Sequence, residues 1–304
     1  MASLATSAFT LPKHLASGLW SKAQTGSTVA ALSGSEPMLF GEHQLMTFTG
    51  RPKAQYVSEG AQKSPTDPTF GTKTVTPHKV QVTMRFNEEV QWADEDYQLG
   101  VLSALSDASG DALARALDLG VYHGINPLTG AAVAQIVAGD RIATTTNSVE
   151  ITTATLTTPD TVLEAAAGLV IADGYTPNGI ALDSSYAWTI ATARYSDGRK
   201  KYPELGLGVN VTGFEGIRAS VSDTVSAPEA SAATNVKAIV GDFTALRWGV
   251  QRNIGVEVIR FGDPDGVGDL KRSNQIALRA EVVYGWAVMD LDAFATVKDA
   301  VANV

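Results

Sequence analysis

Residues 59–91 read EGAQKSPTDPTFGTKTVTPHKVQVTMRFNEEVQ, and their pattern is the most informative about the fold. Its second half has apolar residues largely at every second position, which is typical of a β-strand: Val75, Val80, Val82, Met84 and Phe86. Residues 59–70 are polar and contain two prolines, so they predict a turn without regular pairing. A further extended run, 46–58, precedes this turn. The sequence therefore predicts a long two-stranded ribbon with a loose tip, and because such a ribbon is marginal alone in water, we expect an oligomer to supply the surface it lies on.

The ribbon carries a charge opposite to that of the rest of the chain. The net charge is −9, whereas residues 50–85 hold six bases and two acids, a net of +4, which leaves −13 on the remainder. An acidic body argues against a surface that neutralises DNA phosphates. The basic segment could bind nucleic acid or lie across the acidic surface of an identical neighbour, and the negative remainder favours the neighbour.

Residues 1–45 predict an arm. Leu11, Leu15 and Leu19 give a short amphipathic helix after Pro12, followed by a Gly/Ser-rich stretch with too little apolar surface for a core of its own. The alternative is a frayed terminus. The first residues lack the basic and apolar regions of a secretory signal, and no apolar run approaches the roughly 20 residues of a membrane span, so we expect a soluble protein made in a cytoplasm, with no membrane partner.

The body begins with the clearest helix, over residues 94–121. Its first residues are acidic, and its leucines and alanines recur at three- and four-residue steps. Gly110 interrupts the pattern, and the helix ends at Gly120 or Gly124. A second helix, 160–173, follows Pro159.

Strand patterns are interleaved with these helices. They cover residues 179–182, 216–221, 237–240, 245–250, 256–261 and 274–288. Because no regular βαβ repeat is present and the strands look antiparallel, the predicted class is α+β.

The chemistry of a turnover site is missing from the sequence. There are no cysteines, and the four histidines lie within the first 123 residues without the spacing of metal ligands. No phosphate-binding glycine loop or nucleophile elbow is present. Asp263, Asp265 and Asp269 are similar to a calcium loop, but the glycine and glutamate that such a loop needs are misplaced, so a solvated turn is favoured. We expect no cofactor and no metal.

Three motifs in order along the chain resemble the major capsid proteins of tailed double-stranded DNA bacteriophages, which have the Hong Kong 97 fold. EGAQK at 59–63, followed by Asp67 and Phe70, is similar to the tip of that family's extended loop. KAIVGDF at 237–243 resembles its Gly-Asp-Phe strand, and RAEVVYGW at 279–286 with Asp292 and Phe294 resembles its closing strands. Their order and spacing cover nearly the whole chain.

The resemblance implies a division of the chain and a function. The parts would be an N-terminal arm (1–45), an extended loop (46–85), a peripheral domain (86–129 and 236–304) with the long spine helix 94–121, and an axial domain (130–235). Copies would form pentamers and hexamers that close into an icosahedral capsid around double-stranded DNA, assembled in the bacterial host cytoplasm. The chain starts almost at the arm, so scaffolding would come from a separate protein or be dispensable. A portal and a decoration protein are further expected partners.

The resemblance also implies candidate site residues. In cross-linked members of the family, a loop lysine attacks an asparagine of a neighbouring subunit, helped by a glutamate. Lys63 matches the lysine, and Asn274 and Glu281 match the other two in their separation of seven residues. A lysine must lose its proton to attack, and a carboxylate can serve as the base. In one regular strand Asn274 and Glu281 would face opposite ways, but the family draws the groups from different subunits.

Other interpretations stay open. Lys63 can be simply solvated, Glu281 can pair with Arg279 or Arg85, and Asn274 can cap a turn. At the level of function, the alternatives are an encapsulin, a cellular shell of the same fold that houses an enzyme, and a soluble α+β enzyme, which the lack of a converging polar cluster disfavours.

Overall fold

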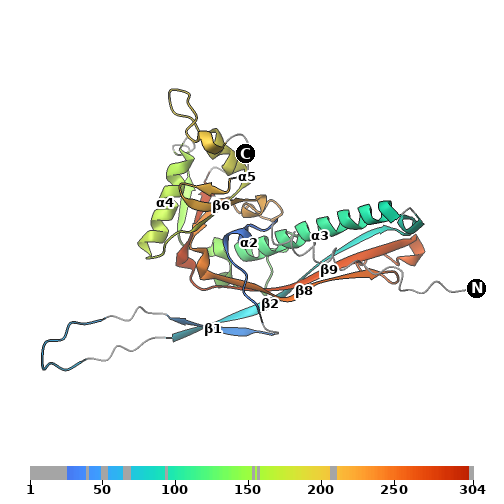
Figure 1. Cartoon of the computed structure of the whole chain (residues 1–304), viewed down its shortest axis with the longest axis horizontal. Coiled ribbons are helices and arrows are strands. Elements are labelled where there is room, and N and C mark those ends of the chain that lie inside the picture. The colour runs from blue at the N-terminus through green and yellow to red at the C-terminus, as the bar shows by residue number, and fades with distance from the viewer. Residues whose placement is uncertain are drawn as a thin grey trace, which may run out of the picture.

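The computed structural model shows two β-sheets that share one long helix (Figure 1). The structure describes residues 26–38, 41–48, 54–63, 70–92, 95–152, 155, 158–205 and 211–300. The predicted helix around Leu11, Leu15 and Leu19 lies outside these residues. Within them, no helix is both long and apolar enough to cross a membrane.

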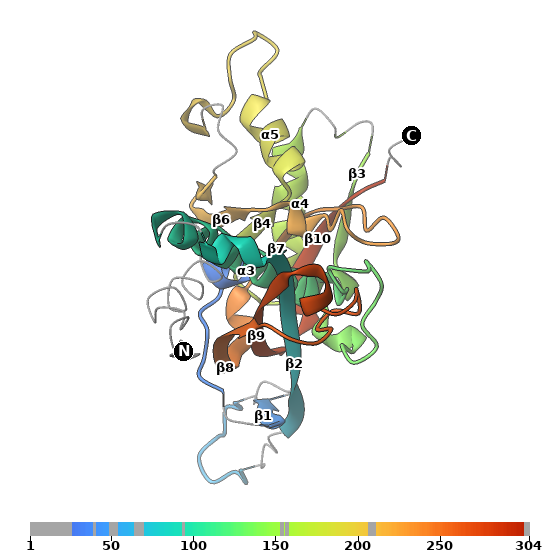
Figure 2. The ribbon, with the colours of Figure 1, turned by 90° about the vertical axis from the view of Figure 1, so that its right-hand side faces the viewer.

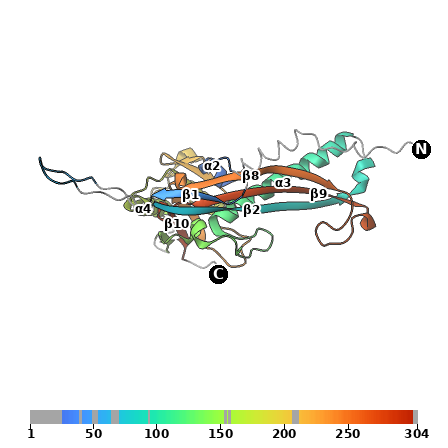
Figure 3. The same cartoon turned by 90° about the horizontal axis from the view of Figure 1, so that it is seen from below.

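The longer sheet is antiparallel and has the strand order β1-β2-β9-β8. Its strands are β1 (His43–Phe48), β2 (Phe70–Asn87), β8 (Leu246–Ile259) and β9 (Gln275–Val288). With 18 residues, β2 is about 60 Å long. Figure 3 shows these strands running side by side along the body, with residues 54–63 lying beyond its end.

One face of this sheet packs on helix α3 (Glu95–His123). Val80 pairs with Val282 across the two central strands, and both belong to the apolar core beneath the helix. The Tyr284 hydroxyl donates to the Leu113 carbonyl oxygen of α3 at 3.3 Å. Alternation along β2 and β9 therefore places even-numbered residues toward α3 and odd-numbered residues on the opposite face.

The predicted helix 94–121 is confirmed as α3, which is about 44 Å long. Gly110 does not interrupt it and Gly120 does not end it. Gly120 is instead a contact point, because a Cβ there would come within 2.9 Å of the Trp286 ring. The helix ends at Gly124, which has a φ of +67° and donates its N–H to the Leu119 carbonyl oxygen at 2.9 Å.

The second sheet is mixed and has the order β3-β10-β7-β4-β6-β5. Its strands are β3 (Ser148–Ile151), β4 (Gly179–Leu182), β5 (Gly213–Phe214), β6 (Ile217–Val221), β7 (Val236–Gly241) and β10 (Phe294–Asp299). Strands β4 and β6 are parallel, as are β3 and β10. The expectation of antiparallel strands was thus wrong here. Helix α5 (Ser184–Thr192) lies between the parallel strands β4 and β6 in the chain, whereas β3 and β10 come from distant parts of it; helix α4 (Pro159–Ala172) lies between β3 and β4. The chain is a mixed α and β protein.

Helices α4 and α5 cover the same face of the mixed sheet. Ile180 and Leu182 of β4 pack in one apolar cluster with both helices, whereas Ala181 belongs to the other cluster, with α3. The sheet is therefore a shared middle layer, with α4 and α5 on one side and α3 on the other.

Residues 26–38 form a strap that contacts helix α3 and the edge strand β8. The short helix α2 (Thr28–Leu32) begins against the carboxylate of Asp118 in α3, which is fully buried. Farther on, Glu36 donates its N–H to the Trp248 carbonyl oxygen at 2.8 Å, so the strap pairs with the edge of β8. Gly249 lies directly under the Glu36 carbonyl and leaves no space for a side chain.

Most predicted elements agree with the structure within a few residues, with two corrections. The extended run 46–58 is a strand only at its start, since β1 ends at Phe48 and residues 54–58 are not in a strand. The runs 245–250 and 256–261 are one strand, β8, whose pairing with β9 shifts register near Arg252. Short 3-10 helices complete the fold: η2 (Glu88–Trp92), η3 (Ala138–Asp140), η4 (Ile142–Thr144), η5 (Pro203–Leu205), η6 (Asp223–Val225), η7 (Phe243–Ala245), η8 (Lys271–Ser273) and η9 (Leu291–Ala293).

Candidate assembly site

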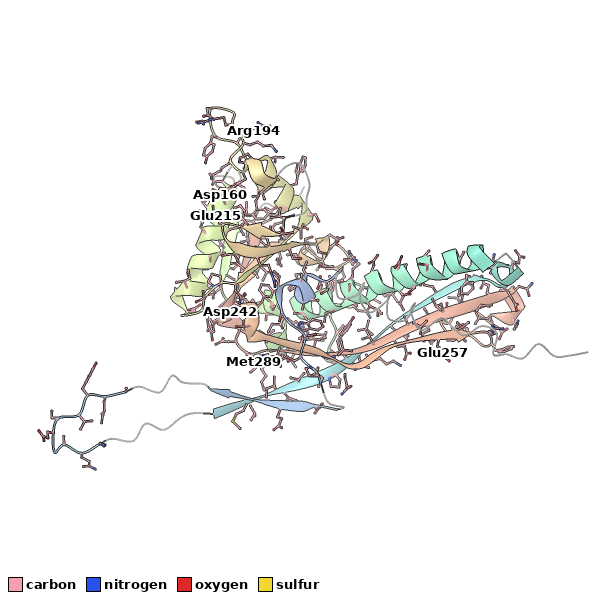
Figure 4. The ribbon with its side chains drawn as sticks, in the orientation of Figure 1. Asp160, Arg194, Glu215, Asp242, Glu257 and Met289 are labelled. Carbon is pink, nitrogen blue, oxygen red and sulfur yellow. The ribbon has the colours of Figure 1, made fainter. Side chains whose placement is uncertain are left out.

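The loop 54–63 is exposed along its whole length. Gly60 has a φ of +81°, and the Ala61 N–H donates to the Ser58 carbonyl oxygen at 3.0 Å, which makes a tight turn. Tyr56 is as exposed as in an extended peptide, and Lys63 is also exposed. Figure 4 shows the side chains of this loop standing away from every other described element. Within one chain, the loop buries nothing.

The base of the ribbon, in contrast, is anchored to the body. The Lys73 ammonium donates to the Gly139 carbonyl oxygen at 2.8 Å and to the Val288 carbonyl oxygen, and it pairs with Asp140 at 3.1 Å. The His78 ring lies 4.6 Å from the Trp286 ring, and burial lowers the pKa of His78. These contacts, which the sequence did not reveal, fix the direction in which the ribbon leaves the body.

Asn274 lies just before β9 and has a left-handed backbone with a φ of 48° and ψ of 46°. Asparagine tolerates this region better than most residues. Its carbonyl oxygen accepts the Glu88 N–H at 2.8 Å, and its side chain is exposed. The predicted alternative that Asn274 ends a turn is confirmed. Because Asn274 precedes the strand, the opposite-face objection that applies within a regular strand does not apply.

Glu281 lies on the odd-numbered face of the sheet, away from α3. Its carboxylate pairs with the Lys79 ammonium on β2 at 3.0 Å. The alternatives that paired it with Arg279 or Arg85 were wrong, because those two arginines bind the turn between β8 and β9. Glu281 is half-buried and keeps part of its carboxylate open to solvent.

The structure does not bring Lys63 to the other two residues within one chain. The loop 54–63 extends from one side of the body, and the turn that precedes β9 lies at the far end of the long sheet (Figure 1). Any reaction among Lys63, Asn274 and Glu281 therefore requires at least two copies.

The turn with Asp263, Asp265 and Asp269 is held by an arginine. The Arg85 guanidinium donates to Asp265 at 2.7 Å, to Asp263 at 3.0 Å and to the Gly268 carbonyl oxygen at 2.8 Å. Hydrogen bonding to Arg85 lowers the pKa of Asp265 to about 2. The expectation of a solvated turn was incomplete, because Arg85 of β2 holds the turn through these hydrogen bonds. In the part of the chain that the structure describes, no cluster of three acidic or histidine side chains could hold a metal ion.

The long exposed loop 54–63 is typical of a protein that binds copies of itself, and comparison with known proteins accounts for it. The model of the phage capsid family matches residues 7–299. The chain belongs to the phage capsid family. It is the major capsid subunit of a tailed-phage icosahedral capsid, a structural component of the virion and not an enzyme.

Similar proteins agree with this assignment along most of the chain. The probable major capsid protein gp17 of Mycobacterium phage D29 is 23% identical over 300 residues, which are 96% of this capsid subunit and 91% of gp17. A solved structure from Mycobacterium phage Ogopogo is 53% identical with a TM-score of 0.81, and covers 90% of this chain and 92% of that one. A chain from Gordonia phage Cozz is 32% identical with a TM-score of 0.77, covering 91% and 87%. The family decides between the capsid and encapsulin interpretations in favour of the capsid.

Proposed function

We propose that this capsid subunit assembles into pentamers and hexamers in which the loop 54–63 of one copy lies on a neighbouring copy. The observation that supports this is the exposure of every described residue of the loop, including Tyr56. A free loop of ten ordered residues gains nothing from burial and costs conformational entropy. Electrostatic attraction between copies also favours this contact, because residues 50–85 are basic and the rest of the chain is acidic.

The division into parts follows from the same proposal. The arm (1–45) includes the strap 26–38 on Asp118 and the first half of β1, and the extended loop (46–85) includes the second half of β1 and nearly all of β2. The peripheral domain (86–129 and 236–304) contains α3 with β8 and β9. The axial domain (130–235) contains α4 and α5, and it surrounds the fivefold and sixfold axes.

A covalent bond between copies is the second part of the proposal. The Lys63 amine attacks the side-chain carbonyl carbon of Asn274 in another copy, the new amide forms, and ammonia leaves. Glu281 accepts the proton that the amine gives up and returns it to the leaving group. The Glu281 carboxylate is half-buried and on the open face of the sheet, where an incoming loop can reach it.

The interior contents and other components follow from the capsid role. The capsid encloses double-stranded DNA without reading its sequence, in keeping with the net charge of −9. A portal, a separate scaffolding protein and a decoration protein are the further partners that we propose.

Purified particles test both parts separately. Size-exclusion chromatography and electron microscopy should show closed particles, and a small oligomer at all concentrations would refute the shell. Boiling the particles in SDS should give a ladder of multimers that disappears in Lys63→Arg, a variant that keeps the charge but does not form the amide. Asn274→Ala and Glu281→Gln should also lose the ladder. A clean band near 31.9 kDa from wild-type particles would end the cross-link and leave the shell intact.

A further inference from the structure

The hairpin 194–201 follows helix α5 and is strongly basic. It reads RYSDGRKK, with four bases and one acid, a net of +3, which leaves −12 on the remainder of the chain. The Tyr195 N–H donates to the Arg199 carbonyl oxygen at 2.9 Å, and the Gly198 N–H donates to the Tyr195 carbonyl oxygen at 2.9 Å. Gly198 has a φ of +83°, which few other residues tolerate. The bases are therefore held on a short, closed turn.

One of the four bases anchors the hairpin to the body. The Lys201 ammonium pairs with Asp160 at the start of α4, and hydrogen bonding to Asp160 raises the pKa of Lys201. Asp160 is buried and also accepts the Tyr202 hydroxyl at 3.1 Å. The charge of Lys201 is thus compensated within the chain, whereas Arg194 and Arg199 are exposed.

The outer bases border a hollow on the hairpin. Its volume is about 570 Å³, and it is lined by Tyr195, Arg199, Lys200 and Pro203. The Arg199 side chain is 81% exposed and pairs with Asp197 at 2.6 Å through Nε, so its two terminal nitrogens face solvent. A guanidinium binds phosphate oxygens through two parallel N–H groups, and an ammonium adds a compact charge. The side chains of this hollow therefore suit phosphate groups.

The hairpin also projects from the body. Figures 1 and 2 both show it extending beyond α5, and Figure 4 shows Arg194 at this end of the molecule. The hairpin belongs to the proposed axial domain (130–235), which surrounds the fivefold and sixfold axes. Without Lys201, each hairpin carries three bases and one acid, a net of +2, so five or six copies gather +10 or +12 around one axis. Such charges repel one another unless an anion lies between them.

We propose that the hairpins 194–201 of one pentamer or hexamer together bind a small anion with several phosphate groups on the axis of the ring, through Arg199 and Lys200. The site rests on the capsid function proposed above and adds a ligand to it. A compact anion reaches every hairpin of the ring at once. A long polyanion such as duplex DNA would also meet the acidic remainder of the chain, which disfavours it as the occupant.

Isothermal titration calorimetry of empty particles with inorganic tripolyphosphate tests the site. We expect about one bound anion for every five or six subunits, because each ring supplies one site. Arg199→Gln removes five or six charges from every ring and should weaken binding roughly tenfold or more. Arg199→Lys keeps the charge and should weaken it by about threefold at most. Arg272→Gln removes an exposed arginine just before β9 and is the matched control, which should bind as the wild type does.

The stoichiometry of wild-type particles decides the matter even where a variant does not assemble. One anion per subunit, no measurable binding, or equal binding by the wild type and Arg199→Gln would overturn the site. Binding of a short DNA duplex without binding of tripolyphosphate would also overturn it, because the hairpin would then contact the genome. If wild-type protein forms no particles, the capsid function fails instead, so the two failures are distinguishable.

Discussion

Asp118→Asn should release the strap 26–38 from the body. The Asp118 side chain is fully buried in α3 and accepts five hydrogen bonds. Two come from backbone N–H groups, those of Thr28 at 3.0 Å and Val29 at 3.1 Å, and these begin α2. Three come from hydroxyls, of which the Thr224 hydroxyl is 2.9 Å away.

The free-energy cost of Asp118→Asn depends on which carboxylate oxygen of Asp118 the amide nitrogen replaces. The two backbone donors bind different carboxylate oxygens, so the amide nitrogen of an asparagine faces one of them in either orientation. One buried N–H then loses its acceptor, and the remaining bonds lose the assistance of a full charge, for a combined cost of about 3 kcal/mol. Such a cost corresponds to a roughly hundredfold increase in the population with the strap open.

Hydrogen exchange of the Thr28, Val29 and Ala30 amides measures this opening directly. The expected result is roughly a hundredfold faster exchange at these amides, with little change in the α4 amides. Glu150→Gln, which removes the same charge from an exposed position on β3, is the control and should change nothing. Unchanged protection of the Val29 amide in Asp118→Asn would show that Asp118 does not hold the strap.

Three further predictions concern other contacts. Gly249→Ala places a Cβ against the Glu36 carbonyl and should lower stability by about 1–3 kcal/mol in urea titration, whereas Gly168→Ala should be neutral or slightly stabilising; equal effects would contradict the strap contact. Arg85→Lys loses the forked donor and should make the turn 261–270 more sensitive to protease at neutral pH; unchanged cleavage rates would show that the clamp is unnecessary. Burial lowers the pKa of His123 below 6.5, so its contribution to stability is present above that pH and is lost as the pH falls below it. His123→Gln should therefore flatten the decline of the urea midpoint between about pH 7.5 and about pH 5. A decline as steep as that of the wild type would contradict this.

Most secondary structure could be predicted because each long element carries a local signal. The period-two pattern of Val80 and Val82 in β2 and the leucine spacing in α3 are properties of consecutive residues, and they were predicted correctly. The effect of Gly110 and Gly120 was not predicted. Tertiary packing outweighs the helix-breaking tendency of glycine there, since Gly120 makes room for Trp286.

The contacts that anchor the loop and the strap could not be predicted, because they join residues far apart in the chain. Lys73 binds groups at Gly139 and Val288, and Asp118 binds Thr224. A lone lysine or aspartate in a sequence carries no sign of its distant partner. Gly249 and Gly285 did carry a local signal, because a glycine inside a strand suggests close backbone approach, and the strap 26–38 lies against both. For the candidate site, the identities of Lys63, Asn274 and Glu281 came from a resemblance, and their meeting between copies stays a prediction.

Electron cryo-microscopy of assembled particles shows directly which copy the loop 54–63 contacts. We expect Tyr56 to be buried against a neighbouring copy, with Lys63 approaching the Asn274 of one neighbouring subunit and the Glu281 of a different one. A map in which the loop folds back on its own chain, or projects freely with no other copy beside it, would contradict the account.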